Sequence, residues 1–238
     1  MLRFWKNLVH LLSAFFSCLR FGFPGRKMTV IGITGTDGKT TTSHLIYTIL
    51  KTANKKVSLV STVAAYINGK EYDTGFHVTT PSSFALQKFM QRSVSYGCEY
   101  FVLEVTSHAL DQYRVWGSSI DIGVITNVSH EHLDYHQTFK NYLDAKAKIL
   151  KGVKFAVLNA DDDNFSYLKT KVNRGAKIVS FGIKNKADNK LSNTKFKLNI
   201  KGEFNLYNYL AAASVSRILE LDEGKISEAL TNFKGIPG

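Results

Sequence analysis

The sequence is poor in cysteine and in acidic residues, and both shortages narrow the range of functions. Two cysteines in 238 residues, Cys18 and Cys98, are too few for a disulfide framework or a cysteine zinc site, and they fit a reducing, cytoplasmic setting. An excess of Lys and Arg (31) over Asp and Glu (19) gives a formal net charge of +12. This balance indicates either anionic partners, such as nucleotides or a membrane surface, or simply a solvated lysine-rich surface. Since no RNA-binding or DNA-reading motif accompanies the charge, we expect no nucleic-acid partner.

The chain also lacks an apolar run long enough to span a bilayer. Its first segment, MLRFWKNLVHLLSAFFSCLRFGFPG, predicts an amphipathic helix with a basic polar stripe. The segment has the n-region and h-region of a secretory signal, but no convincing A-x-A cleavage site follows them. Two interpretations stay open: residues 1–23 lie in a membrane interface, or the helix packs on the domain or on a neighbour. Pro24 and Gly25 end the helix, so we assign residues 1–26 to the helix and its linker.

The remainder, residues 27–238, alternates strand and helix patterns. Apolar runs typical of buried parallel strands occur at 28–34, 57–62, 99–105, 120–128 and 154–160, with later strands predicted at 177–183 and 194–200. Helical spacing follows the first run and recurs at 82–97, 138–151, 162–172, 204–220 and 224–233. A β-hairpin is predicted around Asn68-Gly69. The pattern predicts a doubly wound α/β domain with a mostly parallel sheet, a small antiparallel extension, and ligands at the carboxyl ends of the strands.

The first strand leads into GITGTDGKTTTS, residues 32–43, which lacks one glycine of the usual phosphate-binding loop. The Walker A pattern G-x-x-x-x-G-K-[ST] needs that glycine where this chain has Ile33. Strand, glycine turn and helix nevertheless follow one another as a phosphate site requires, with backbone N–H groups at the helix N-terminus. Lys39 could reach the outer phosphates, and the Thr40 hydroxyl could ligate Mg²⁺. The alternative is a glycine turn that only caps a helix.

Two further strands are followed or ended by residues suited to a metal-phosphate centre. Glu104 lies at the end of the run EYFVLEV, where a carboxylate would face the ligand edge of the sheet; the alternative is a solvated strand end. The loop after the strand at 120–128 contains His130, His132 and His136. These histidines predict either a zinc site or a loop that meets the metal-phosphate centre.

Two polar residues fall on helix faces that are otherwise apolar. Lys146 shares a stripe with Phe139, Tyr142, Leu143, Ile149 and Leu150. A lysine on a buried face is unfavourable unless it is paired, chemically altered, or able to extend its ammonium group to water. Asn208 shares a face with Phe204, Ala211 and Val215. A buried amide needs partners, which can be backbone groups or a ligand such as an adenine.

Six segments together carry a family resemblance. They are GTDGKTTT, TTP (79–81), EVTSHALDQYRV, TNVSHEHLDYH, YLDAK (142–146) and GEFNLYNYLAA. In this order they resemble the central ATPase domain of the bacterial Mur ligases, nearest to the MurE type, over about residues 28–238. The short G-x-x-G-K-T loop is this family's form, and the resemblance implies a P-loop NTPase-like fold. Folylpolyglutamate synthases share the loop but not SHALDQYRV followed by HLDYH.

The resemblance implies roles for the nucleotide and metal residues. The loop that would hold the phosphates of ATP consists of Gly35, Thr36, Asp37, Gly38, Lys39, Thr40 and Thr41. Asn208 would contact the adenine. Thr40 and Glu104 would ligate one Mg²⁺ ion, and His132 a second. Lys146 would be carbamylated by CO₂ and so become an anionic metal ligand. Lys39, His132 and Lys146 would form the catalytic set.

The resemblance also implies a set of residues that bind the acceptor substrate. The residues that would contact a UDP-muramoyl-dipeptide are Thr79, Thr80, Thr106, Gln112 and Arg114. Most members of the family have Asn in place of Asp37, and many have Ser in place of Thr106; both changes keep a small polar group.

The implied reaction is ATP-dependent formation of an amide bond in peptidoglycan precursor synthesis. A substrate carboxylate attacks the γ-phosphate, giving an acyl phosphate and ADP, and the amine of an amino acid then displaces phosphate. A sibling ligase acting on another acidic substrate is one rival, and a non-catalytic nucleotide-binding module is another. The motifs TTP and SHALDQYRV favour a ligase, because a bare module would not need them.

The sequence departs from the family pattern at both ends. A MurE-type enzyme has a preceding domain for the uridine end of its substrate and a following domain for the incoming amino acid. Here about 25 residues precede the first strand, too few for such a domain, and the chain stops at FKGIPG. We therefore expect a fragment that binds nucleotide but ligates slowly or not at all alone. We expect it to be a monomer in the cytoplasm or at the inner face of the membrane.

Overall fold

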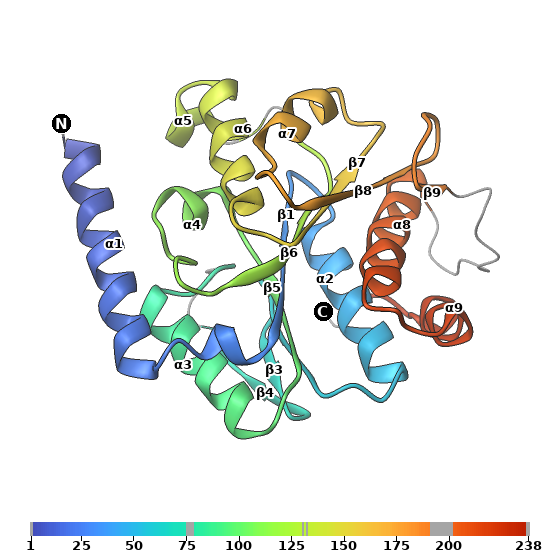
Figure 1. Cartoon of the computed structure of the whole chain (residues 1–238), viewed down its shortest axis with the longest axis horizontal. Helices are drawn as coiled ribbons and strands as arrows, with labels where there is room; N and C mark the ends of the chain where they lie inside the picture. The colour runs from blue at the N-terminus through green and yellow to red at the C-terminus, as the bar shows by residue number, and fades with distance from the viewer. Residues whose placement is uncertain (1, 75–78, 130, 132, 191–201, 237–238) are drawn as a thin grey trace.

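The computed structural model describes residues 2–74, 79–129, 131, 133–190 and 202–236 (Figure 1). In these residues nine strands form one sheet in the order β4-β3-β2-β5-β1-β6-β7-β8-β9. The strands are β1 Thr29–Thr34, β2 Val57–Val60, β3 Ala65–Ile67, β4 Lys70–Tyr72, β5 Tyr100–Glu104, β6 Ile120–Ile125, β7 Phe155–Asn159, β8 Lys177–Gly182 and β9 Asn189–Lys190. The seven neighbouring strands β2-β5-β1-β6-β7-β8-β9 are all paired in parallel. Strands β3 and β4 extend the sheet beyond β2 as an antiparallel edge. The predicted α/β sheet is confirmed.

Helices cover both faces of this sheet. They are α1 Leu2–Phe21, η1 Pro24–Lys27, α2 Lys39–Thr52, α3 Ser83–Ser95, α4 Ser107–Asp111, α5 Leu133–His136, α6 Phe139–Ala147, η2 Lys148–Leu150, α7 Phe165–Lys171, α8 Glu203–Ile218 and α9 Glu223–Asn232. One core packs α2, α8 and α9 on the sheet, and the other packs α3, α4, α6 and α7 on the opposite face (Figure 1). Side chains of β1 alternate between the cores, with Ile31 and Ile33 in the first and Val30 in the second.

The hairpin at the antiparallel edge has the turn that its sequence predicts. Asn68 and Gly69 both adopt positive φ, 51° and 73°, between β3 and β4. A two-residue turn with this conformation matches the twist of antiparallel strands, which is why Asn-Gly is favoured there.

Two expectations about local structure need correction. The segment after β5 contains α4, which was not predicted because five residues are too few to show helical periodicity; Thr106 begins it by accepting a hydrogen bond from the Ala109 N–H at 3.1 Å. The single helix predicted at 138–151 is divided into α6 and η2. The strand predicted at 194–200 lies outside the described residues.

The predicted N-terminal helix is present as α1. It lies along the outside of the domain beside α3, at one end of the view in Figure 1. Among the described helices, none is both long enough and apolar enough to cross a membrane.

Candidate nucleotide and acceptor site

The loop between β1 and α2 is shaped by close contacts that only glycine permits. Gly38 has φ 77°, and a Cβ atom there would lie 2.1 Å from Asn208 Oδ1. A Cβ atom on Gly35 would lie 1.8 Å from Thr126 Oγ1. The loop is therefore pressed between the end of β6 and α8, and α2 begins at Lys39 as predicted.

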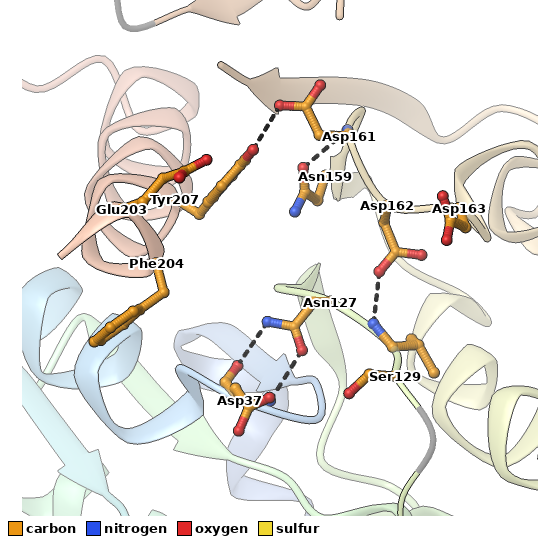
Figure 2. Close-up of a pocket in the computed structure, with 11 residues that line it drawn as sticks. Asp37, Asn127, Ser129, Asn159, Asp161, Asp162, Asp163, Glu203, Phe204 and Tyr207 are labelled. Atoms are coloured by element: carbon orange, nitrogen blue, oxygen red, sulfur yellow. Dashed lines mark hydrogen bonds between the residues drawn. The ribbon is translucent and has the colours of Figure 1, made fainter. Parts of the chain in front are cut away.

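Asn127 holds the loop in place through the backbone of Asp37. The Asp37 N–H donates to Asn127 Oδ1 at 2.9 Å, and the Asn127 amide donates back to the Asp37 carbonyl at 3.2 Å (Figure 2). The Thr126 hydroxyl donates to the same carbonyl at 2.6 Å. The Asp37 side chain is exposed and lines a cavity beside the loop. The loop conformation thus depends on the backbone of this residue, which Asp and Asn share.

Two lysines converge on the first carbonyl of the loop. Lys39 folds back so that its Nζ atom donates to the carbonyls of Gly35 at 3.1 Å and Thr36 at 2.7 Å. Lys146 comes from α6 on the other side, and its Nζ atom also donates to the Gly35 carbonyl. Two amino groups on one oxygen repel each other if both are charged.

Lys146 is buried as its place on the apolar stripe predicts. Only 2% of it is exposed, and its Nζ atom lies 4.5 Å from the centre of the Tyr142 ring. It does not extend its amino group to water, so the snorkelling alternative is wrong. Burial, and next the charge of Lys39, hold the pKa of Lys146 well below its usual value. A lowered pKa favours the neutral amine, which is a nucleophile.

Tyr142 joins the same helix to the glycine loop. Its hydroxyl lies 3.1 Å from Thr36 Oγ1, and burial raises the pKa of Tyr142 to about 12. The Ser129 N–H also donates to Thr36 Oγ1, at 2.9 Å. The hydroxyl of Thr36 therefore ties the loop to α6 and to the segment after β6.

Glu104 and Thr40 are brought together, as the predicted metal pair requires. Glu104 ends β5 beside the loop, and the Thr40 hydroxyl donates to its Oε1 at 2.9 Å. Thr62, beyond the end of β2, donates to both carboxylate oxygens, through Oγ1 at 3.0 Å and through its N–H at 2.9 Å. Glu104 is 1% exposed, so the alternative of a solvated strand end is wrong.

Two adjoining cavities open beside the loop. One, of about 540 Å³, lies between Asp37, Asn127 and the residues after β7 (Figure 2). The other, of about 470 Å³, is lined by Asp37, Gly38, Thr41, Asn127, Phe204 and Asn208. Asp37, Asn127 and Phe204 line both, so the cavities form one depression next to the phosphate loop.

Asn208 is buried on α8 at the wall of this depression. Its Oδ1 atom accepts a hydrogen bond from the Thr42 hydroxyl at 3.3 Å. Ala211 and Val215 are buried on the same side, but Phe204 is 69% exposed. The expectation that Phe204 shares the buried face is therefore wrong: it lies in the first turn of α8, beyond the packed part of the helix, at the mouth of the depression.

The predicted acceptor residues form a second cluster at the same edge of the sheet. Thr80 Oγ1 accepts from the Thr106 N–H at 3.0 Å and donates to the Glu104 carbonyl at 3.1 Å. Arg114 donates to the Thr80 carbonyl at 3.1 Å and to Gln112 Oε1 at 2.9 Å. Thr79, next to Thr80, is half-buried. Burial lowers the pKa of Arg114 from its usual value.

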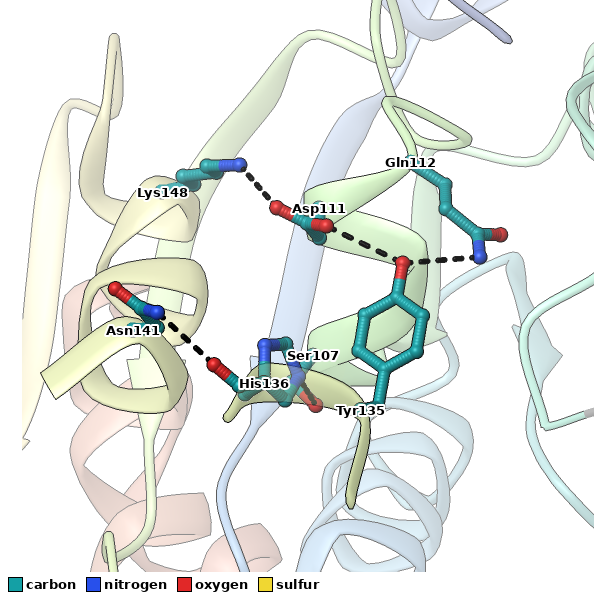
Figure 3. A network of polar contacts seen from close by, with 7 residues as sticks. All are labelled: Ser107, Asp111, Gln112, Tyr135, His136, Asn141 and Lys148. Atoms are coloured by element: carbon teal, nitrogen blue, oxygen red, sulfur yellow. Dashed lines mark hydrogen bonds and ion pairs between the residues drawn. The ribbon is translucent and has the colours of Figure 1, made fainter. Parts of the chain in front are cut away.

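A polar network extends from Gln112 of this cluster to Lys148 (Figure 3). Tyr135 accepts from the Gln112 amide at 3.2 Å and donates to Asp111 Oδ2 at 3.2 Å. Asp111 in turn pairs with Lys148 at 2.9 Å. The orientation of Gln112 therefore depends on a tyrosine from the histidine-rich motif.

The three histidines of that motif are only partly described. His136 is fully buried, with Nε2 3.0 Å from Ser107 Oγ. His130 and His132 lie outside the described residues. Within those residues, no group of three or more His, Cys, Asp or Glu side chains is arranged to hold a metal ion.

Thr62, Thr126 and Asn127 belong to the site but were not predicted. Thr62 ends the predicted run at 57–62, and Thr126 and Asn127 lie near the end of the predicted run at 120–128; the carboxyl ends of such strands meet at the ligand edge of the sheet. That rule could have found them. Their partners depend on the strand order, which the sequence does not show.

This geometry defines a class of protein. A parallel sheet, a glycine loop that starts a helix, and a buried carboxylate beside the Lys-Thr pair are the parts of a phosphate-binding-loop nucleotide domain. The family model for the Mur ligase middle domain matches residues 33–216, and the chain belongs to this family.

Similar proteins agree with the family assignment. The chain is 37% identical over 235 residues to a UDP-N-acetylmuramoyl-L-alanyl-D-glutamate–2,6-diaminopimelate ligase of Parabacteroides distasonis, covering 92% of this chain and 48% of that protein. A solved structure of a ligase with the same name matches with a TM-score of 0.80 and 26% identity, over 89% of this chain and 47% of the other. A MurF structure from Acinetobacter baumannii matches in fold, with a TM-score of 0.73 and 17% identity over 98% of this chain and 51% of the other. The chain spans about half the length of the curated relatives it matches.

Proposed function

We propose that this domain binds ATP and activates a carboxylate for amide bond formation. The acceptor would be UDP-N-acetylmuramoyl-L-alanyl-D-glutamate, and the amine would come from an amino acid; the relatives' names specify 2,6-diaminopimelate. The observation that carries the proposal is the 2.9 Å contact between Thr40 and Glu104 at the edge where the acceptor cluster also lies.

The loop would hold the phosphates of ATP and Asn208 the adenine. The N–H groups at the start of α2 offer donors to phosphate oxygens. Lys39 would leave the carbonyls of Gly35 and Thr36 and turn to the outer phosphates, where its charge offsets the charge on the transferring group. Side-chain changes of this kind are common on binding.

Thr40 and Glu104 fit a hard cation such as Mg²⁺. The Thr40 hydroxyl uses its proton on Glu104, which leaves its lone pairs available for a cation. Glu104 supplies the negative charge. When bound, Mg²⁺ would neutralise phosphate charge and favour phosphoryl transfer. We propose that His132 contributes to a second metal site.

Lys146 would react with CO₂ to form a carbamate. The neutral amine attacks the carbon atom, an N–C bond forms, and one proton passes to water. Burial and the neighbouring Lys39 both favour the neutral form that this step needs. The product would be an anion beside the phosphate loop.

Thr79, Thr80, Thr106, Gln112 and Arg114 would bind the acceptor. The contact of Thr80 with the Glu104 backbone links the acceptor side to the nucleotide side. Holding the carboxylate close to the γ-phosphate would supply the orientation that the transfer requires. Two free, buried cysteines support a reducing cytoplasmic setting, where we propose the protein is a monomer.

The test is ATP turnover by this chain with the acceptor and 2,6-diaminopimelate, with and without an added C-terminal ligase domain. We expect nucleotide binding by the chain alone and ADP release only with acceptor present. Nucleotide binding with no response to the acceptor would favour a non-catalytic module. Turnover with a different acidic substrate would favour a sibling ligase.

The carbamate has its own test. With ¹³C-bicarbonate we expect a carbamate carbon signal that Lys146→Ala lacks. In a complete ligase the variant should lose acyl-phosphate formation, and bicarbonate or short carboxylic acids should partly restore it. Full activity of Lys146→Ala would contradict the carbamate.

A further inference from the structure

Helix α1 packs on the domain through its small residues. Ala14 and Cys18 are fully buried, and Ser17 is 5% exposed. The Cys18 thiol donates to the Trp116 carbonyl at 3.5 Å, and a Cβ atom on Gly117 would come within 2.4 Å of Cys18 Sγ. The helix therefore approaches the backbone of the domain closely at Trp116 and Gly117.

Five of its large apolar residues form an exposed stripe, whereas Leu8, Leu11 and Phe21 are half-buried. The outward stripe, here called the α1 stripe, consists of Trp5 (59% exposed), Val9 (64%), Leu12 (47%), Phe16 (63%) and Leu19 (52%). Their spacing of four, three, four and three residues keeps them on one face along the helix. An amphipathic helix that served only its own domain would bury such a stripe of large apolar residues.

Basic side chains border the stripe. At 100° per residue, Lys6 and Arg20 fall next to its Val9 edge, and both are exposed. Arg26 and Lys27 follow in η1, also exposed. Helix α1 contains no Asp or Glu. An apolar face with a basic border is the pattern of helices that lie in the interface of an anionic membrane.

The apolar surface continues beyond the helix. Phe15, 40% exposed, has its ring centre 5.9 Å from that of Trp116, which is 38% exposed. Trp116 also lines a cavity of about 430 Å³, whose lining includes Lys151 and also Lys148, which is paired with Asp111. Aromatic residues next to lysines suit the boundary between lipid headgroups and acyl chains.

We propose that the α1 stripe docks the protein on a membrane surface rich in anionic lipid, with α1 lying in the interface and not crossing it. The basic border distinguishes this partner from an apolar protein groove or a second copy, since a second copy would bring the same positive charges together. The proposal is independent of the ligase function.

The experiment is flotation of the 238-residue chain with vesicles. We expect binding to phosphatidylcholine vesicles that contain phosphatidylserine, and weaker binding to phosphatidylcholine alone. Val9→Glu with Phe16→Glu should lower the partition coefficient at least about tenfold, because charged groups would enter the apolar layer. Lys6→Gln with Arg20→Gln should lower it about 25-fold on anionic vesicles only, at about fivefold per charge.

The control is Lys169→Gln with Lys177→Gln, which removes two positive charges from exposed sites distant in the sequence, on α7 and β8. It matches the charge change of the Glu variant, and we expect binding close to wild type. Failure of the wild-type chain to bind, or equal binding by the Val9→Glu/Phe16→Glu variant, would overturn the proposal. So would light scattering that shows a wild-type dimer which the same variant converts to a monomer without vesicles.

Discussion

Helices α1 and α6 break the same rule of burial in opposite directions. Helix α6 carries Lys146 into the core with 2% of it exposed, whereas α1 leaves Phe16 63% exposed to solvent. A buried amine is unfavourable by several kcal/mol unless it is neutralised or paired, and each exposed large apolar side chain forgoes roughly 1.5–3 kcal/mol of burial. Departures of this size mark functional positions more often than packing errors.

The two departures differ in what surrounds them. Lys146 is a single exception on a well-packed face, and it touches the loop proposed to bind phosphate. The α1 stripe is a whole face that the described domain leaves uncovered. A single buried polar group indicates chemistry at one point, whereas a continuous apolar face indicates contact with a surface.

The largest expected effect is that of Lys146→Met, which removes the amine and keeps the volume. Proposed carbamate chemistry predicts a loss of ATP turnover of at least about 10³-fold in a complete ligase. Lys140→Met, on the exposed side of the same helix, is the control and should retain turnover. Steady-state ADP release measures the turnover of the two variants. Comparable turnover by them would contradict a functional role for Lys146, and with it the comparison between α6 and α1.

The same variant should be more stable than wild type. The folded pKa of Lys146 is well below the unfolded value of 10.5, so between these two pKa values folding releases a proton and stability rises as pH rises toward 10.5. The Met variant lacks this dependence. We expect a gain on the order of 1 kcal/mol at pH 7 that narrows toward pH 10, measured by denaturant unfolding. A stability difference independent of pH would contradict a neutral Lys146.

Glu104→Gln tests the second buried polar group of the site. We expect the Mg²⁺ concentration needed for half-maximal nucleotide binding to rise about 10- to 100-fold, because the amide keeps the shape but loses the charge. Glu99→Gln removes the same charge just before β5, at the opposite end of that strand, and is the control. Titration of Mg²⁺ at fixed nucleotide measures both. An unchanged Mg²⁺ requirement would limit Glu104 to a structural role.

Much of this site could be predicted from the sequence, because several of its residues stand out against the pattern of their neighbours in the chain. Lys146 interrupts an apolar stripe, and the glycine loop follows a buried strand; both signals need only the residues nearby. The contacts of Asp37 with Thr126 and Asn127, and of Glu104 with Thr62, could not be predicted, because they depend on β6 and β2 lying beside β1 and β5. Sheet order is a tertiary property that local pattern does not encode.

The orientation of α1 could not be predicted for a different reason. Its amphipathic pattern distinguishes two faces but not which one meets the domain. The choice depends on Gly117 and the Trp116 carbonyl, which are about 100 residues away in the sequence and admit only small side chains.

Ala14→Leu should separate α1 from its domain. A larger side chain at a fully buried position overpacks the contact, with an expected destabilisation of about 1–3 kcal/mol. Because the contact is local, the effect should appear as faster hydrogen exchange and proteolysis in residues 5–20 before global unfolding. Ser13→Leu, at the exposed neighbouring position, is the control. Equal protection of α1 in both variants would mean that the small face does not hold the helix.

The smallest effect on the free energy of unfolding is expected from substitutions in the α1 stripe. Val9→Glu with Phe16→Glu should change the free energy of unfolding in solution by less than about 0.5 kcal/mol, because both side chains already meet water. Chemical denaturation without lipid measures this, and the exposed lysine pair Lys169→Gln/Lys177→Gln sets the scale for a change of two charges. A loss as large as that of Ala14→Leu would mean that the stripe stabilises the domain itself. A negligible change, together with lost vesicle binding, would assign the two faces of one helix to different partners: the face with Ala14 and Cys18 to the domain and the α1 stripe to the membrane.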